Sequence, residues 1–191
     1  MNENGFDLKD FRRVCGKFPT GVTVTTLVGA DGRPYGITLS SFTSISLMPP
    51  LVLVCIDHRA AILAHCGIGK HFGINILSDC QKDLSVQFSG KWSDRFLGVR
   101  WRPGVTGVPL LDDVPGALEC ITTEMIRAGD HWIVIGQALH VRTSEKSPLA
   151  YFESSYGKVA RHQPEALREV EPTLEKLDVQ QAKTAAGAKA Q

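Results

Sequence analysis

Strand-forming runs joined by tight turns are the feature that most restricts how this chain can fold. Residues 22–27 are mostly β-branched, and residues 51–56 are apolar at every position, which is typical of a buried strand with no polar face. Residues 117–126 and 132–142 form two longer strand patterns. Many strands that follow one another through hairpins favour an antiparallel barrel decorated by helices, because regular alternation of strand and helix is missing.

The remaining strands and turns are expected to be short. Asp31-Gly32 is the strongest hairpin signal in the chain, and residues 34–38 would be the returning strand. We expect another strand over residues 72–77 and a loop over residues 105–114, which contain a Gly and a Pro. A hairpin turn over residues 127–131, with a glycine supplying an unusual φ, joins the two longer strands.

Helices are expected at three places before the C-terminal part. Residues 8–14 carry apolar side chains at helical spacing, and Asp7 is placed to cap that helix. Residues 60–66 predict a short helix, and Ser78-Asp79 predicts the start of another one. The fold class that follows is mainly β with short helices.

Composition and charge argue against several classes of protein. A net charge of +1 gives no basic surface for nucleic acid, no run of 18 apolar residues could span a membrane, and the polar N-terminus lacks a signal-peptide core. Five cysteines without a Cys-x-x-Cys pair predict a reducing cytoplasm and no disulfide or zinc framework. His65, Cys66 and His71 lack a fourth ligand at a known spacing, so we expect no bound metal.

Common nucleotide and hydrolase motifs are missing from the sequence. Gly67-Ile68-Gly69 is followed by Phe72 where the dinucleotide fingerprint needs Gly or Ala, and neither a Walker A run nor a Gly-x-Ser-x-Gly elbow occurs. A nicotinamide cofactor would therefore have to bind by another route.

The segment from Gly36 to Ser44 places five hydroxyl residues in nine positions and runs into residues 45–50, which end in Pro49-Pro50. Small side chains and hydroxyls of this kind suit a planar ligand that carries a phosphate, because they let it approach the backbone and donate to it. The same residues are also common in ordinary turns, so both interpretations stay open on composition.

The pattern resembles the short-chain flavin reductases, which have the FMN-binding split-barrel fold and are reductase components of two-component flavin-dependent monooxygenases. The resemblance covers residues 11–156 and lies in the order of seven short landmarks. They are Phe18-Pro19-Thr20-Gly21-Val22, Gly36-Ile37-Thr38-Leu39-Ser40-Ser41-Phe42, Pro49-Pro50-Leu51-Val52, Phe72-Gly73-Ile74-Asn75-Ile76-Leu77, Asp94-Arg95-Phe96, Glu119-Cys120 and Gly129-Asp130-His131.

The resemblance implies a set of site residues. His131 would be the catalytic residue that places the nicotinamide, although a His in a hairpin turn also has a purely structural explanation. Relatives often carry Ser or Thr where this chain has Ala60-Ala61, so backbone N–H groups and Arg59 would have to bind the flavin phosphate there. The flavin-binding residues implied are Thr38, Leu39, Ser40, Ser41, Asp57, His58, Arg59, Ala60, Ser89, Lys91, Phe96 and Tyr156.

The implied function is that of an NAD(P)H:flavin oxidoreductase. It would reduce FMN or FAD with hydride from NADH or NADPH and supply the reduced flavin, by diffusion, to a partner monooxygenase. The resemblance also implies a cytoplasmic homodimer. A flavin-binding electron-transfer protein without nicotinamide activity is the alternative, and a pyridoxamine-phosphate oxidase shares the barrel but not evident substrate motifs.

The C-terminal part differs in composition from the rest. We expect a reductase domain over residues 1–164 and a polar, Ala-rich segment over residues 165–191. Within that segment, residues 165–177 predict a surface helix and residues 178–191 a disordered tail.

Overall fold

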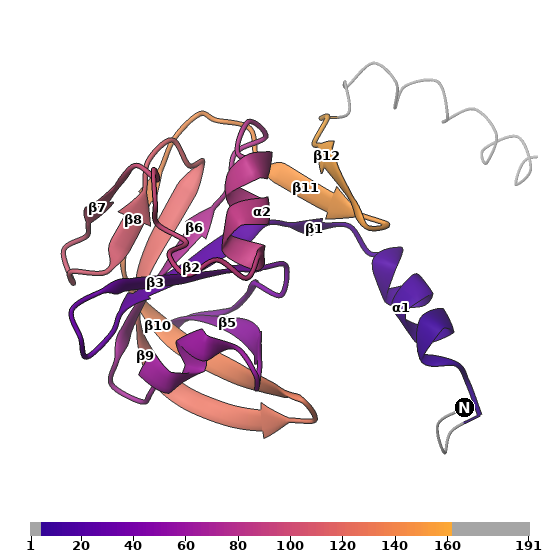
Figure 1. The fold of residues 1–191 in the computed structure, drawn as a ribbon, viewed down its shortest axis with the longest axis horizontal. Coiled ribbons are helices and arrows are strands. Elements are labelled where there is room, and N and C mark those ends of the chain that lie inside the picture. The colour runs from indigo at the N-terminus through magenta and orange to yellow at the C-terminus, as the bar shows by residue number, and fades with distance from the viewer. Residues whose placement is uncertain (1–4, 162–191) are drawn as a thin grey trace, which may run out of the picture. The chain divides into compact units, whose positions relative to one another are not determined.

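The computed structural model describes residues 5–161 of the chain (Figure 1). Two α-helices and one 3₁₀ helix accompany twelve strands in this part. The elements are α1 Leu8–Gly16, β1 Thr20–Gly21, β2 Thr23–Val28, β3 Pro34–Leu39, β4 Thr43–Leu47, β5 Pro50–Asp57, η1 Ala61–His65, β6 His71–Ile76, α2 Lys82–Ser89, β7 Trp101–Pro103, β8 Pro109–Leu111, β9 Gly116–Ala128, β10 His131–Thr143, β11 Leu149–Phe152 and β12 Ser155–Lys158.

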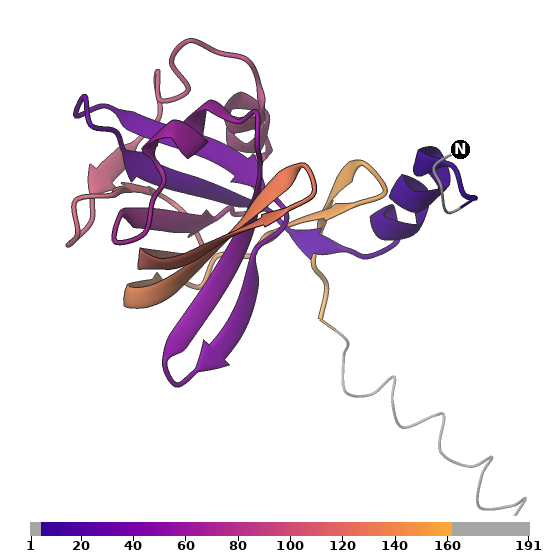
Figure 2. The same ribbon diagram turned by 90° about the horizontal axis from the view of Figure 1, so that it is seen from below.

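A seven-stranded antiparallel sheet forms the body, in the order β3-β2-β6-β9-β10-β5-β4. Its edge strands, β3 and β4, do not pair with each other, so the barrel stays open, as the split-barrel expectation requires. A two-stranded β7-β8 sheet and a three-stranded β1-β11-β12 sheet complete the β structure. Figure 2 shows the β4–β5 hairpin (purple) extending away from the rest of the sheet.

Two apolar clusters fill the interior. One lies between α2 and the sheet and includes Phe88, Phe96 and Leu111, while the other lies against β5, β6 and β10 and includes Val54 and Ile74. Burial of apolar side chains on this scale is the main favourable term in folding. No described helix is long and apolar enough to cross a membrane.

A buried asparagine ties β8 to the sheet. The side-chain amide of Asn75 donates to the carbonyl of Val24 at 3.1 Å and to the hydroxyl of Thr26 at 3.2 Å, and its oxygen accepts from the backbone N–H of Leu111 at 2.8 Å. Thr26 in turn donates to the carbonyl of Pro109 at 2.5 Å. Each buried polar atom of this group thus has a partner, which burial requires.

Most of the expected elements are confirmed. Asp7 caps α1 by accepting from the backbone N–H of Lys9 at 3.0 Å, and Gly32 (φ +74°) and Gly129 (φ +60°) supply the backbone conformations that their turns need. The strands predicted at residues 22–27, 34–38, 51–56, 72–77, 117–126 and 132–142 are β2, β3, β5, β6, β9 and β10. The predicted helix at 60–66 is the 3₁₀ helix η1.

Three expectations were wrong or incomplete. The second helix begins at Lys82 and not at Ser78, because the side chain of Gln81 accepts from the backbone N–H of Ser78 and donates to the carbonyl of Asp112. The predicted loop over 105–114 contains strand β8. Strands β1, β4, β7, β11 and β12 were not foreseen. The predictions for residues 165–177 and 178–191 lie outside the described residues.

Glu119 is a buried carboxylate on β9 that holds the loop before β8. Its oxygens accept from the backbone N–H groups of Val105 (3.0 Å) and Thr106 (2.7 Å) and from the Thr106 hydroxyl (2.6 Å). Burial by itself raises the pKa of Glu119, but these hydrogen bonds outweigh it and the pKa is lowered below its usual value. The ionised carboxylate therefore stabilises the folded loop.

We predict that Glu119→Gln lowers the free energy of unfolding at pH 7 by about 1–3 kcal/mol, because the loop N–H groups lose a charged acceptor. A lowered folded pKa means that this stabilisation is present above the usual carboxyl pKa and is lost as pH falls through the folded value. Urea unfolding at several pH values measures both effects, and the difference between wild type and variant should shrink in acid. Exposed Glu124→Gln on the same strand is the control. Equal stability of the two variants at pH 7 would contradict the prediction.

Candidate functional site

The hydroxyl-rich segment forms the second half of β3 and the turn after it. Gly36 is buried, and a Cβ atom there would lie 2.5 Å from the Phe88 ring, so glycine lets β3 approach α2. The Thr38 hydroxyl donates to the carbonyl of Ser85 on α2 at 2.7 Å. Thr38 therefore joins strand to helix, and its hydroxyl proton is already used by the protein.

Ser41 joins the same segment to β5. Its hydroxyl accepts from the backbone N–H of Cys55 at 2.8 Å and donates to the carbonyl of the same residue at 3.0 Å. Neighbouring Ser40 is exposed, and its hydroxyl makes no hydrogen bond to the residues that the structure describes. Of the hydroxyls at 38, 40 and 41, that of Ser40 is thus the one with full bonding capacity for a ligand.

Tyr156 on β12 reaches the same helix. Its hydroxyl lies 2.9 Å from the hydroxyl of Ser85, so Thr38 and Tyr156 both contact one residue of α2. The Lys82 ammonium lies 5.8 Å from the centre of the Tyr156 ring, and the Tyr151 ring packs against it at 5.2 Å. The structure therefore brings Tyr156 close to the hydroxyl segment, although 118 positions separate it from Thr38 in the sequence.

The loop after α2 forms one wall of a cavity of about 470 Å³. Arg95 holds this loop to β3, because its guanidinium donates to the carbonyls of Gly36 (2.8 Å) and Gly90 (3.0 Å). Burial lowers the pKa of Arg95 below its usual value. No carboxylate of the described residues pairs with its guanidinium. The lining residues are Arg33, Pro34, Tyr35, Gly36, Ala61, Ile62, Trp92, Ser93, Asp94, Arg95 and Phe96.

Other predicted residues of this region have structural partners. The Ser89 hydroxyl donates to the carbonyl of Val86 at 2.9 Å at the end of α2, and Phe96 is buried against Phe88 with ring centres 5.0 Å apart. Leu39 packs against the second apolar cluster. Lys91 is exposed and does not line the cavity.

A polar corner forms where β5 ends beside the β9–β10 turn; its residues are Asp57, His58, Arg59, Asp130 and His131. Arg59 donates to both carboxylate oxygens of Asp57, at 2.6 and 3.0 Å, which holds the pKa of Asp57 well below its usual range. The backbone N–H of His58 donates to the carbonyl of Asp130 at 2.9 Å, and its ring Nδ1 lies 2.7 Å from the same oxygen.

His131 lies in this corner because β10 pairs with β5 and places it opposite Asp57. Its Nδ1 is 2.7 Å from the carboxylate of Asp130, and this contact lowers the pKa of Asp130. If the ring is neutral and donates from Nδ1, its other nitrogen, Nε2, is a hydrogen-bond acceptor. If the ring is protonated, Nε2 is a donor. The side chain is 43% exposed, so Nε2 can meet a ligand.

Some groups of this site were not foreseen from the sequence. Asp130 was part of a landmark but was not assigned to orient His131, and Ser85, Trp92 and Arg33 received no role. The adjacency of Asp130 and His131 was an available signal. By contrast, Ser85 links Thr38 to Tyr156 only after α2 packs on β3, which no local pattern indicates.

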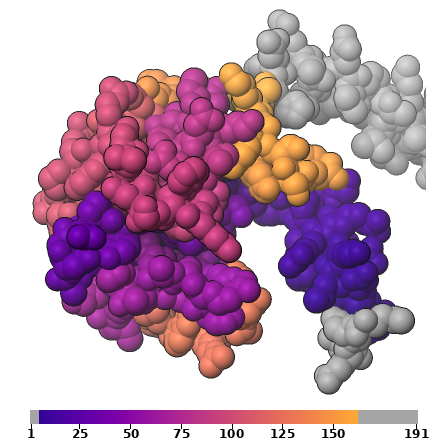
Figure 3. All heavy atoms as spheres, viewed as in Figure 1, coloured from indigo at the N-terminus to yellow at the C-terminus, as the bar shows by residue number. Residues whose placement is uncertain are grey.

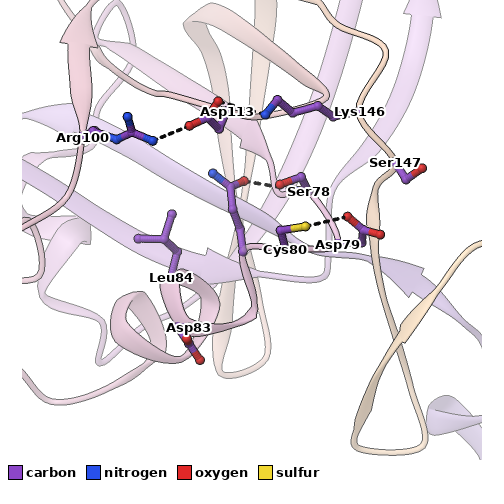
Figure 4. Close-up of a pocket in the computed structure, with 10 residues that line it drawn as sticks. Ser78, Asp79, Cys80, Asp83, Leu84, Arg100, Asp113, Lys146 and Ser147 are labelled. Atoms are coloured by element: carbon purple, nitrogen blue, oxygen red, sulfur yellow. Dashed lines mark hydrogen bonds and ion pairs between the residues drawn. The ribbon is translucent and has the colours of Figure 1, made fainter.

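A second cavity of about 490 Å³ lies between α2 and the segment before β11 (Figure 4). Its charged groups pair with each other, since Asp113 bonds both Arg100 (2.6 Å) and Lys146 (2.9 Å). The thiol of Cys80 lies 3.4 Å from the carboxylate of Asp79, which also pairs with Lys158. None of the predicted site residues lines this cavity.

Ser41→Ala should lower the free energy of unfolding by about 1–3 kcal/mol, because the backbone groups of Cys55 lose their partner. Ser40→Ala is the matched control and should change it by less than about 0.5 kcal/mol, since the hydroxyl is exposed. Urea unfolding at pH 7 measures both. A similar small change in the two variants would show that other contacts hold the turn.

Comparison with known proteins places these features in a family. Residues 15–160 match the family described as "Flavin reductase like domain". The reductase subunit Stc3 of stachydrine N-demethylase from Rhizobium meliloti is 40% identical over 156 residues, which are 82% of this chain and 68% of that protein. Flavin reductase (NADH) from Kitasatospora aureofaciens is 41% identical over 152 residues, 78% of this chain and 80% of that protein.

Solved structures agree with the sequence matches. The NADH:FAD oxidoreductase SgcE6 of Streptomyces globisporus, in complex with NAD and FAD fragments, superposes with a TM-score of 0.75 at 32% identity and covers 84% of this chain and 95% of that one. The chain spans only about half the length of some other curated relatives that it matches.

Proposed function

The chain belongs to the flavin reductase-like family, and from this premise we propose that it is an NAD(P)H:flavin oxidoreductase. It reduces FMN or FAD with NADH or NADPH and supplies the reduced flavin to a partner monooxygenase. Relatives that are named as reductase components of flavin-dependent monooxygenases support the second part. The five cysteines, all unpaired, support a reducing cytoplasm.

One observation carries the proposal. Pairing of β10 with β5 brings His131, the residue implied for the nicotinamide, next to residues 57–60, which are implied for the flavin. Residue 60 is followed directly by Ala61 at the edge of the 470 Å³ cavity. A flavin and a nicotinamide must lie against each other for hydride transfer, so their binding residues must be adjacent.

The residues present fit these cofactors. Arg95 provides a partly buried positive charge without a described carboxylate partner, which suits a phosphate-bearing ligand. The exposed hydroxyl of Ser40 can donate to a flavin ring or ribityl oxygen. Arg59 is a weaker candidate for phosphate, since Asp57 holds its guanidinium through two hydrogen bonds. Backbone N–H groups are therefore the better candidates beside Ala60.

The chemistry asks little of the protein beyond alignment. When bound, the flavin accepts the hydride that the nicotinamide donates, and that transfer needs no strong acid or base from the chain. His131 hydrogen-bonds the carboxamide or a phosphate of the nicotinamide nucleotide through Nε2. Asp130 holds the ring in one orientation through its contact with Nδ1.

We also propose that the protein acts as a homodimer. No residue of α1 is buried, and its apolar side chains Leu8, Phe11 and Val14 are exposed. Figure 3 shows α1 (indigo) standing away from the body with open space between them. The β4–β5 hairpin likewise exposes Leu47 (90%) and Met48 (93%) at its tip. A second copy of the chain can cover the exposed apolar side chains of α1 and of the hairpin tip, and so remove them from water.

The outer face of the β5–β10 pair supports the same proposal. Leu53 and Cys55 pair with Ile135 and Ile133, and all four side chains are only half-buried. Together with α1 and the hairpin tip, these residues give the second copy several apolar surfaces to cover.

The function is tested by following NADH and NADPH oxidation with added FMN or FAD. We expect His131→Ala to raise the KM for the nicotinamide nucleotide, or to lower kcat/KM, by about five- to tenfold, the equivalent of one lost hydrogen bond. Flavin affinity, measured by fluorescence titration, should stay nearly constant. Exposed His140→Ala at the other end of β10 is the control.

Two results would change this assignment. If His131→Ala lost flavin affinity while its KM for the nicotinamide nucleotide stayed unchanged, His131 would be a flavin-binding residue. Tight flavin binding with no oxidation of either nicotinamide nucleotide would favour an electron-transfer protein.

The dimer is tested by sedimentation at micromolar concentration. Phe11→Asp places a charge in the apolar face of α1 and should shift the protein from dimer towards monomer, because that face can no longer be buried without a desolvation cost. Arg12→Ala, on the same helix, should leave the dimer intact. A wild-type protein that sediments as a monomer would overturn the proposal.

A further inference from the structure

His58 contacts the β9–β10 turn through two separate donors. Its backbone N–H donates to the carbonyl of Asp130 at 2.9 Å, and its ring Nδ1 lies 2.7 Å from the same oxygen. A carbonyl oxygen accepts hydrogen bonds and cannot donate them, so Nδ1 carries a proton and is the donor. One nitrogen of the ring is therefore committed to the turn, which differs from the flavin contact that the resemblance implies for His58.

Asp130 accepts from two imidazole rings. Its carbonyl accepts from Nδ1 of His58, and one oxygen of its carboxylate lies 2.7 Å from Nδ1 of His131. His58 directly follows β5, and His131 is the first residue of β10. Asp130 is thus the link between the ring at the end of one strand and the ring at the start of the other.

The turn that carries Asp130 is exposed. A Cβ atom at Gly129 would meet nothing within 4 Å beyond its chain neighbours in the part of the chain that the structure describes. The Asp130 side chain is 73% exposed. An exposed carboxylate can adopt several rotamers, so it orients His131 well only when the backbone from which it extends is held in place. The two donors of His58 hold that backbone.

The neighbouring ion pair leaves the His58 ring available for this contact. Oδ1 of Asp57 lies 3.7 Å from Nδ1 of His58, which is beyond hydrogen-bond distance. Both oxygens of Asp57 instead accept from the guanidinium of Arg59, at 2.6 and 3.0 Å. Because Arg59 occupies this carboxylate, the carbonyl of Asp130 is the acceptor that Nδ1 of His58 reaches.

From these contacts we propose that His58 is a positioning residue for the nicotinamide nucleotide. It acts through the main chain of Asp130, whose carboxylate holds Nδ1 of His131 and thereby fixes the direction of Nε2 of His131. The proposal rests on the proposed function and deepens it, because it adds a residue that affects the nicotinamide nucleotide without touching it. In this arrangement His58 does not bind the flavin.

Steady-state kinetics with added flavin are the first test. His58→Ala should raise the KM for the nicotinamide nucleotide, or lower kcat/KM, by about two- to tenfold, the equivalent of one hydrogen bond. His58→Asn should restore most of the loss, because its amide nitrogen reaches about the position of Nδ1. His58→Gln, whose amide nitrogen reaches about the position of Nε2, should not. His71→Ala, which removes an exposed imidazole at the start of β6, is the control.

A double-mutant cycle separates positioning from an independent role. In the His131→Ala background Asp130 has no ring to orient, so His58→Ala should cause almost no further loss of kcat/KM. Flavin affinity, measured by fluorescence titration, should stay within about twofold in every variant, which is the usual error of such cycles.

A second readout needs no cofactor. The ¹⁵N chemical shifts of the His131 ring report which nitrogen carries the proton, and they are measured at about pH 8.5, where an ordinary imidazole is neutral. We expect the Nδ1–H form in the wild-type protein and in His58→Asn. In His58→Ala and His58→Gln the signals should move towards the mixture of both forms that a ring without a fixed acceptor adopts.

Three results would overturn the proposal. The first is unchanged kinetics and unchanged His131 ring signals in His58→Ala, or, if that variant does not fold, equal values for His58→Asn and His58→Gln. The second is a loss of flavin affinity in His58→Ala, which would assign His58 to the flavin. The third is a loss in the double variant that multiplies the loss in His131→Ala.

Failure of the proposed function would look different. A wild-type protein that oxidised neither NADH nor NADPH would overturn the reductase proposal. The ring signals of His131 would then still show whether His58 positions it, because they are measured without flavin or nicotinamide nucleotide.

Discussion

The antiparallel pairing of β10 with β5 is the interaction on which the candidate site depends most. It sets His131 opposite Asp57 and brings the β9–β10 turn against residues 57–60. His58 reinforces the pairing, since its backbone N–H and its ring both contact the carbonyl of Asp130. Because side chains alternate between the faces of a strand, a register shift of one residue would turn His131 to the opposite face and separate it from this corner.

The hydroxyl-rich segment is used mainly to build the scaffold around the site. Thr38 binds α2 and Ser41 binds β5, so two of the predicted ligand hydroxyls fix the position of the segment that carries them. This explains why so many hydroxyls stand beside an apolar strand: a turn between packed elements has backbone groups that must find partners. Among the predicted site residues that the structure describes, those that keep free bonding capacity include Ser40, Lys91 and Nε2 of His131.

Local patterns predicted much of the fold. The Asp31-Gly32 turn, the capped helix α1 and the long β9–β10 hairpin follow from turn chemistry and periodicity, which act over a few residues. Strand β8 was missed because Gly107 and Pro109 favour a loop there, yet Asn75 and Thr26 hold it against the sheet across separations of 36 and 83 positions. The start of α2 was misplaced because the Gln81 side chain binds the backbone N–H of Ser78 and the carbonyl of the distant Asp112, which holds residues 78–81 outside the helix.

The sequence by itself determined that this chain forms an antiparallel β protein, and its ordered landmarks indicated a flavin reductase with candidate residues in five separate segments. Only the tertiary structure decided which of those residues meet and which groups stay free. It set His131 against residues 57–60, used the hydroxyls of Thr38 and Ser41 for packing, and opened a cavity rimmed by Trp92 and Arg33. The physical reason is that hydrogen-bond partners and burial are properties of contacts between distant segments, whereas turn and strand preferences are properties of neighbouring residues.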